Sequence, residues 1–241
     1  MEAEILNFGR LKSYQHIFFD LDHTLWDFER NSEETIAELY QFLKMDAVGI
    51  PSARNLYESF EKANRWAWNQ YHLDLIDKES LRINRFQIAL SDYGVHDNDL
   101  AENMAQHYLY NCPQKKHLLP GSIEILEYLV QKTKLHLISN GFAEITQQKI
   151  ENTGLKGYFK SVTTPSHSGH KKPQKEMFMY ALQKANCSAK DALMIGDDVE
   201  ADVLGAQRCG IDQVFFNPSK QINVVESTYE IEELNQLRHF L

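Results

Sequence analysis

The chain has 241 residues, of which 43% are hydrophobic and 24% are charged. These values are typical of a globular protein that can bury the core of one large domain or two small ones. The formal net charge of −9 argues against a general nucleic-acid-binding protein, which usually carries a basic face. We therefore expect no nucleic-acid partner.

The N-terminal sequence MEAEILNFGRLKSYQ lacks the apolar segment of a secretory signal. No stretch approaches the roughly 18 uninterrupted apolar residues of a membrane-spanning helix. Cys112, Cys187 and Cys209 form neither a CxxC pair nor a zinc-binding pattern, and reduced thiols are typical of the cytosol. We expect a cytoplasmic protein with no membrane partner.

Short apolar runs that end in turn residues recur along the chain, and such runs suit strands buried on both faces of a parallel sheet. These predicted strands are 16–20, 134–140, 161–166, 192–198 and 213–218. Helical patterns lie between them, at 122–132 with a Ser122 cap, 143–154 ending at Gly154, 173–186 starting at Pro173, and 200–210. The alternation predicts an α/β fold with a doubly wound, Rossmann-like parallel sheet. The acidic tail, 226–237, reads as a final strand or loop followed by a solvated helix.

Residues 27–117 have a different texture, with few strand signals and several amphipathic helical stretches. The predicted helices are 31–45, 53–72, 78–93 and 98–110. This pattern indicates a small helical bundle inserted after the first strand. We therefore expect a Rossmann-like core formed by 1–26 and 118–241, and a helical cap domain formed by 27–117.

Polar residues follow the predicted strands, where ligands bind in doubly wound sheets. Asp20 and Asp22 follow the first strand, and Ser139 and Asn140 follow the second. Lys171 and Lys172 precede a predicted helix, and the segment GDDVEAD after the fourth strand carries Asp197, Asp198 and Asp202. We expect these side chains to converge although they are far apart in sequence.

This set of residue types suits phosphoryl transfer. Carboxylate oxygens are the ligands that Mg²⁺ prefers, with water and a substrate phosphate completing the shell. One carboxylate can attack phosphorus and a second can protonate the leaving oxygen. A helix N-terminus and a lysine can hold the phosphate.

The motifs DLDHT (20–24), SN (139–140), KP (172–173) and GDDVEAD (196–202) resemble, in order, the four motifs of the haloacid dehalogenase superfamily. The inserted helical segment resembles that superfamily's C1-type cap, and the resemblance covers nearly the whole chain beyond residue 15. It implies Asp20 as nucleophile and Mg²⁺ ligand, and Asp22 as general acid and base whose carbonyl also binds the metal. The other implied roles are a loop brace (Thr24), phosphate binding (Ser139 and the Asn140 N–H), charge neutralisation (Lys172), metal binding (Asp197) and support around the metal and Lys172 (Asp198, Asp202).

The presence of Asp22 favours ester phosphates, because dehalogenases of the superfamily lack an acid at that position. The variant DLDHTLWDF, with His23 and Trp26 as candidate substrate contacts, resembles the pyrimidine 5′-nucleotidase branch. We expect a Mg²⁺-dependent phosphatase acting on small phosphate monoesters, chiefly nucleoside 5′-monophosphates. A sugar-phosphate phosphatase, a phosphomutase and a non-catalytic binding protein stay open as alternatives, and the sequence does not indicate the oligomeric state.

Overall fold

Six parallel strands form the sheet of a computed structural model that describes residues 12–222 and 225–241. In chain order they are β1 (His16–Phe19), β2 (Lys134–Ile138), β3 (Phe159–Thr163), β4 (Ala192–Gly196), β5 (Asp212–Phe216) and β6 (Tyr229–Ile231). Their spatial order is β3-β2-β1-β4-β5-β6. The strand order therefore reverses next to β1, which is where doubly wound sheets bind ligands. Residues 1–11, which are part of the N-terminal segment expected to contain no secretory signal, lie outside the described residues.

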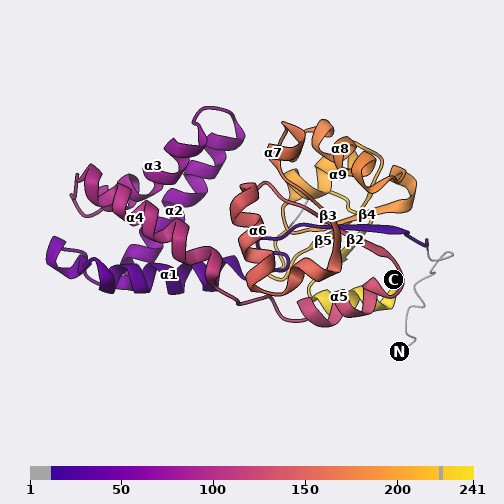
Figure 1. The fold of residues 1–241 in the computed structure, drawn as a ribbon, viewed down its shortest axis with the longest axis horizontal. Coiled ribbons are helices and arrows are strands. Elements are labelled where there is room, and N and C mark those ends of the chain that lie inside the picture. Colours follow the sequence, from indigo (N-terminus) through magenta and orange to yellow (C-terminus); the bar gives the residue numbers. More distant parts are fainter. Residues whose placement is uncertain (1–11, 223–224) are drawn as a thin grey trace. The chain divides into compact units, whose positions relative to one another are not determined.

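Helices cover both faces of this sheet, with α5 (Ser122–Val130) on one face and α8 (Lys175–Ala185) and α9 (Gly205–Gln207) on the other (Figure 1). This unit also contains α6 (Ala143–Asn152), α7 (Pro165–Ser168) and a π-helical segment (Val199–Leu204). The predicted α/β doubly wound fold is confirmed. Helices on both faces explain why the strands are almost continuously apolar.

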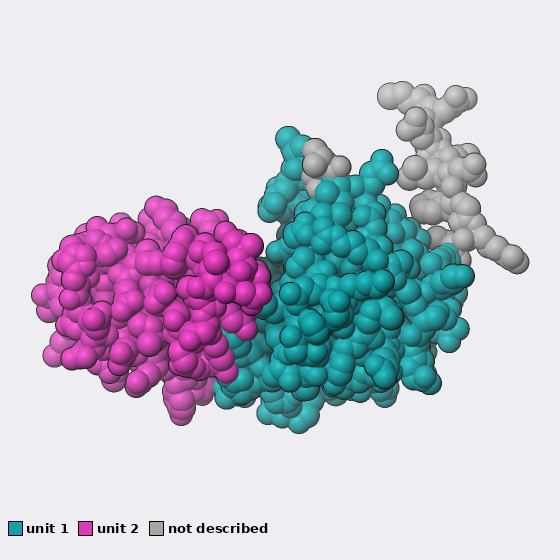
Figure 2. Space-filling model, turned by 90° about the horizontal axis from the view of Figure 1, so that it is seen from above, with its two compact units in different colours: residues 1–26, 118–241 teal, residues 27–117 magenta. Residues whose placement is uncertain are grey.

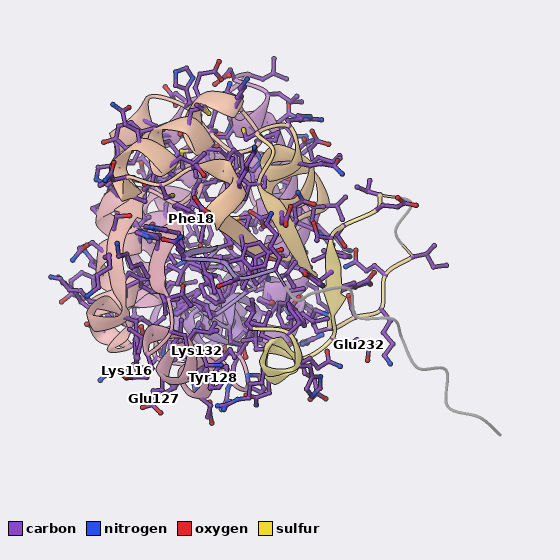
Figure 3. All side chains as sticks on the ribbon, turned by 90° about the vertical axis from the view of Figure 1, so that its right-hand side faces the viewer. Phe18, Lys116, Glu127, Tyr128, Lys132 and Glu232 are labelled. Atoms are coloured by element: carbon purple, nitrogen blue, oxygen red, sulfur yellow. The ribbon has the colours of Figure 1, made fainter. Side chains whose placement is uncertain are left out.

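The core of this unit lies where strand side chains meet the flanking helices. Phe18, at the middle of the sheet, packs with Ile138 and Met194 against Phe178 of α8. Figure 3 shows Phe18 inside the unit, whereas Glu127 and Lys132, at and just after α5, lie at its surface. The buried apolar side chains fix the strands, and the strands in turn fix the positions of the polar residues that follow them.

The chain divides into two compact units, one comprising residues 1–26 and 118–241 and the other residues 27–117 (Figure 2). The second unit, called unit 2 below, contains α1 (Phe28–Phe42), α2 (Ala53–His72), α3 (Lys78–Ser91) and α4 (Asn98–Asn111). Acidic or hydroxyl side chains cap all four helices at their N-termini: Asp27, Ser52, Asp77 and Asp97. The boundaries coincide with those expected from the change of texture, and the role of unit 2 as a cap stays a prediction.

The interior of unit 2 is aromatic. Phe60, Phe86 and Tyr108 contact one another with ring centroids 4.9 to 5.8 Å apart. The buried guanidinium of Arg85 lies 4.7 Å from the Tyr108 ring centroid and donates to Asn64. Three aromatic residues of α2, Trp66, Trp68 and Tyr71, lie outside this interior. Trp66 is 44% exposed, and Trp68 and Tyr71 are half-buried.

Several local predictions are wrong in detail. Gly121, in the left-handed conformation at φ 84°, is the N-cap of α5 instead of Ser122, whose buried hydroxyl donates to the Leu25 carbonyl. Pro173 precedes α8, which begins at Lys175. The C-terminal segment does form a strand and a 3₁₀-helix (Leu234–His239), but that helix is not fully solvated, since Leu234 and Leu237 are buried. Gly154 does follow α6 at φ 75°, as a terminating glycine should.

Cys112, Cys187 and Cys209, which all lie within the described residues, form no disulfide. Among the described residues, no helix has the length and apolar character needed to cross a membrane.

Candidate active site

Two carboxylates lie side by side at the ends of the neighbouring strands β1 and β4. Asp20 follows β1 directly, and its backbone N–H donates to the Ile195 carbonyl of β4 at 2.9 Å. Asp197 follows β4, and its Oδ1 accepts a 2.8 Å hydrogen bond from the hydroxyl of buried Thr24. Because the two strands pair in register, their carboxyl ends deliver both acids to one place. Thr24 thereby links the loop after β1 to the loop after β4.

Lys172 reaches this pair from the segment that connects α7 to α8. Its Nζ lies 2.5 Å from Asp20 Oδ1 and 2.6 Å from Asp202 Oδ1, and it also donates to the Ile138 carbonyl at 3.1 Å. Lys172 is 3% exposed, so its ammonium is withdrawn from bulk water. The structure thus brings Lys172, and not Lys171, to Asp20, as the sequence predicts.

Burial and mutual repulsion dominate the electrostatics of the carboxylates. Burial raises the pKa of Asp20 well above its usual range; Asp202 and Asp197 add to the rise, while Lys172 opposes it. Burial, with the charge of Asp202, raises the pKa of Asp197 to about 7. Burial likewise raises the pKa of Asp202. Lys172 keeps its proton, because the two acids raise its pKa against the effect of burial. Three carboxyl groups thus share the single ammonium of Lys172, and a further cation would relieve their repulsion.

The donor set fits a divalent cation with a preference for oxygen. Oxygens of Asp20, Asp197 and Asp202 all lie within 4.8 Å of one another. Both oxygens of Asp202 are already engaged, one by Lys172 and the other by the Asp198 N–H at 3.1 Å. Asp20 and Asp197 are therefore the better candidates for direct ligands. An all-oxygen site of this kind suits Mg²⁺.

The loop after β2 places further donors near the acids. Ser139 is buried, and its Oγ accepts from the Gly141 N–H at 3.0 Å. A side chain at Gly141 would crowd Thr146 Oγ1 and Ser139 Oγ, at 2.8 and 3.2 Å from its Cβ. The Asn140 side chain exchanges two hydrogen bonds with the Lys172 backbone, from Nδ2 to the carbonyl at 3.0 Å and from the N–H to Oδ1 at 2.7 Å. Asn140 therefore fixes the chain that carries Lys172, a role that the sequence did not indicate.

Asp22 has a different partner from Asp20. Its Oδ1 lies 2.5 Å from the Nζ of Lys149 on α6. The sequence predicts this helix but does not indicate Lys149 as a residue of the site. The Lys149 ammonium also lies 3.9 Å from the ring centroid of Trp26, which is fully buried. The signal that could have found Lys149 is its helical spacing, since it shares the buried face of α6 with Thr146 and Ile150.

The remaining predicted residues lie beside these groups. His23 is exposed and adopts a left-handed conformation at φ 63°, a region that favours glycine but in which histidine is enriched among other residues. Asp198 caps the π-helical segment, because its Oδ1 accepts from the Ala201 N–H at 2.7 Å. That segment carries Asp202, so Asp198 supports the position of Asp202 through the backbone.

Comparison with known proteins agrees with this arrangement. A model of the haloacid dehalogenase-like hydrolases matches residues 14–210, which include every residue discussed above. The chain belongs to the haloacid dehalogenase-like hydrolase family. The segments that contain Asp20, Lys172 and Asp197 meet at the carboxyl ends of the strands, as the sequence predicts.

Two relatives of this haloacid dehalogenase-like hydrolase are phosphatases with different substrates. Pyrimidine 5′-nucleotidase PynA of Streptococcus pneumoniae is 31% identical, over 90% of this chain and 91% of its own. Ribulose-1,5-bisphosphate 5-phosphatase of Halopiger xanaduensis is 32% identical, over 88% of each chain. This hydrolase is therefore a phosphatase acting on phosphate monoesters, which sets aside a non-catalytic protein on the same scaffold.

A solved structure shares the fold of this hydrolase over its whole length. The HAD-hydrolase YfnB of Bacillus subtilis superimposes with a TM-score of 0.85 and 26% identity, covering 95% of this chain and 98% of that one. That structure contains magnesium, and interdomain movement is described for it.

Proposed function

We propose that this phosphatase hydrolyses nucleoside 5′-monophosphates with the help of Mg²⁺ and through an aspartyl-phosphate on Asp20. The observation that carries the proposal is the position of Asp20, which is buried with Lys172 at 2.5 Å and with Asp197 on the adjoining strand end. The similarity to PynA supports the nucleotide, and the magnesium bound by YfnB supports the metal.

Asp20 and Asp22 divide the chemistry in this proposal. An oxygen of Asp20 attacks phosphorus, the bond between phosphorus and the ester oxygen breaks, and Asp22 gives its proton to that departing oxygen. Asp22 then takes a proton from water, whose oxygen attacks phosphorus and releases inorganic phosphate and free Asp20. Two carboxylates are needed because one must attack while the other carries a proton.

Other groups hold the phosphate while its charge shifts. In this proposal Ser139 and the Asn140 N–H donate to phosphate oxygens. The burial of Ser139 beside the acids and the contact of Lys172 with Asp20, where the ammonium supplies positive charge, support these roles. Mg²⁺, held by Asp20, Asp197 and the Asp22 carbonyl, would neutralise charge on the phosphate and on Asp20. Unit 2 acts as the cap in this proposal, and the interdomain movement described for YfnB supports that role.

A sugar-phosphate substrate is the second candidate, because the ribulose bisphosphate phosphatase is about as similar to this chain as PynA is. A phosphate-release screen decides between them. The panel contains UMP, dUMP, dTMP, purine monophosphates, pentose phosphates and hexose phosphates, each with Mg²⁺ and with a chelator. Preference for pyrimidine nucleotides supports the proposal. Turnover of sugar phosphates with none of any nucleotide would overturn it, and a need for a bisphosphorylated activator would indicate a phosphomutase.

A further inference from the structure

The ion pair between Lys149 and Asp22 joins a helix to the loop after β1. Lys149 is 5% exposed, and the Asp22 side chain is 26% exposed, so the carboxylate faces the solvent-accessible side of the pair. Burying an ammonium is costly unless it is well partnered. The Asp22 carboxylate at 2.5 Å and the indole face at 3.9 Å both offset that cost.

The Trp26 indole is a fixed surface beneath the ammonium. Its side chain is fully buried, and the chain from Leu21 to Trp26 closes on itself through hydrogen bonds. The Trp26 N–H donates to the Leu21 carbonyl at 2.8 Å, and the His23 N–H donates to the Trp26 carbonyl at 3.0 Å. The loop therefore places Asp22 and Trp26 together, and Lys149 contacts both.

The orientation of Asp22 follows from these contacts. Lys149 holds Oδ1, while Oδ2 lies 3.9 Å from the point that a Cβ on Gly141 would occupy. That same point lies 3.2 Å from Ser139 Oγ. Oδ2 is thus turned toward the loop proposed to bind phosphate, where an ester oxygen would leave.

Two of the buried lysines, Lys172 and Lys149, pair with different acids. Lys172 pairs with Asp20 and Asp202, whereas Lys149 pairs with Asp22. The acid that attacks and the acid that transfers the proton are therefore each held by a cation of their own. The two cations come from different parts of the chain.

We propose that Lys149 is a positioning residue for Asp22: supported by Trp26, its ammonium holds one oxygen of the carboxyl group and directs the other toward the departing oxygen. Lys149 keeps its own proton throughout. The proton that reaches the leaving oxygen comes from Asp22, and the proton that returns to Asp22 comes from water. This role rests on the proposed aspartyl-phosphate chemistry and adds a residue to it.

The test compares substrates whose leaving groups differ in their need for a proton. A nucleoside alkoxide must be protonated as it departs, whereas 4-nitrophenolate leaves without help. For Lys149→Met we expect kcat/KM on UMP, which reports the steps up to departure of the nucleoside, to fall about 10²-fold, in the range of general acid catalysis. We expect kcat/KM on 4-nitrophenyl phosphate to change less than about threefold, because hydrolysis of the aspartyl-phosphate, which needs Asp22 for both substrates, affects kcat alone. Asp22→Asn should show the same selectivity, and the double variant should lose little more than either single one.

Matched variants separate positioning from other roles. Lys149→Arg, which can still pair with Asp22, should recover part of the UMP activity. Lys156→Met removes an exposed lysine that pairs with Glu151 at 2.5 Å and should leave both substrates unchanged. Thermal unfolding of each variant checks folding, and Lys149→Gln replaces Lys149→Met if the latter unfolds.

Three results would overturn the role. Equal losses of kcat/KM on both substrates would show a structural residue, and a raised KM for UMP with unchanged kcat would show a direct substrate contact. Wild-type protein without turnover of UMP or any other nucleotide would overturn the proposed function and this role with it. Active wild type with unselective Lys149 variants would overturn this role alone.

Discussion

Lys172 Nζ lies 2.5 Å from Asp20 Oδ1, although the two residues are 152 positions apart in the sequence. Asp20 is fixed by its place at the end of a central strand. Lys172 is fixed by the Asn140 side chain, which donates to the Lys172 carbonyl and accepts from the Lys172 N–H. The pair is buried, and the same ammonium reaches Asp202 at 2.6 Å.

Removal of Lys172 should therefore affect folding as well as activity. In Lys172→Met, Asp20 and Asp202 lose their shared cation while they stay buried. Breaking a buried ion pair from one side typically costs about 3–5 kcal/mol, and we expect that loss in the free energy of unfolding measured with urea at pH 7. Lys156→Met, which breaks an exposed pair, should cost less than about 1 kcal/mol. Similar values for the two variants would contradict the account.

Mg²⁺ should stabilise the fold if Asp20 and Asp197 bind it. Burial and, after it, the charge of Asp202 raise the pKa of Asp197 to about 7. A bound cation offsets both effects, so binding favours the folded state. Mg²⁺ at 100 times its Kd should add about 2.7 kcal/mol, seen as a rise in Tm that a chelator reverses. Asp197→Asn should reduce the rise, whereas Asp99→Asn, at an exposed position on α4, should keep it. A full rise in Asp197→Asn would place the metal elsewhere.

Gly196 is the last residue of β4, and its lack of a side chain makes room for Asp202. A Cβ at this position would overlap the Asp202 carboxylate, so Gly196→Ala must displace the partner of Lys172. We expect a loss of about 1–3 kcal/mol in stability, typical of overpacking, together with a large loss of phosphatase activity.

Gly157→Ala is the matched control, because no atom lies within 4 Å of the Cβ that it adds. It should leave stability and activity close to wild type. An equally active Gly196→Ala enzyme would mean that Asp202 need not stay where the structure places it.

The stability of the sheet should fall in mild acid because of a buried histidine pair. His16 Nδ1 and His136 Nε2 lie 3.0 Å apart, and burial, the charge of His16 and Lys134 lower the pKa of His136 from 6.5 to about 4. His136 therefore stays neutral in the folded state while the unfolded chain takes up a proton. Its contribution to stability is complete above pH 6.5 and is lost progressively as the pH falls to about 4.

His136→Gln keeps a hydrogen-bonding side chain but cannot be protonated, so its unfolding free energy should depend less steeply on pH between 7 and 5. Urea unfolding at pH 7, 6 and 5 measures the slope, with His96→Gln, at an exposed position, as the control. A slope in His136→Gln as steep as that of wild type would exclude the histidine pair as the cause.

The strand ends of the site could be predicted because they follow from local pattern. Asp20 and Asp197 each end an apolar run, and parallel strands bring such ends together. The start of α5 was less predictable, since Gly121 caps it and Ser122 turns inward to Leu25. That choice depends on tertiary contacts that no local pattern contains.

Lys149 could not be predicted to reach Asp22, because the two residues are 127 positions apart and lie on different elements. Its spacing from Thr146 and Ile150 indicates the buried face of α6, but only the packing of α6 shows which acid it meets. The hydrogen bonds between Asn140 and the Lys172 backbone likewise depend on how the loop after β2 meets the segment between α7 and α8. The sequence therefore did not indicate the roles of Lys149 and Asn140, because both roles depend on contacts between separate elements.

The central claim is that Asp20 carries the phosphoryl group, and a rapid-quench experiment tests it most directly. Wild-type protein is mixed with Mg²⁺ and UMP labelled in its phosphate, then quenched in acid within one turnover, and the labelled peptide is identified. The account predicts transient label on the peptide containing Asp20, and neither label nor turnover above about 10⁻³ of wild type in Asp20→Asn. Label on a different residue, or Asp20→Asn protein that releases phosphate at the wild-type rate, would contradict it.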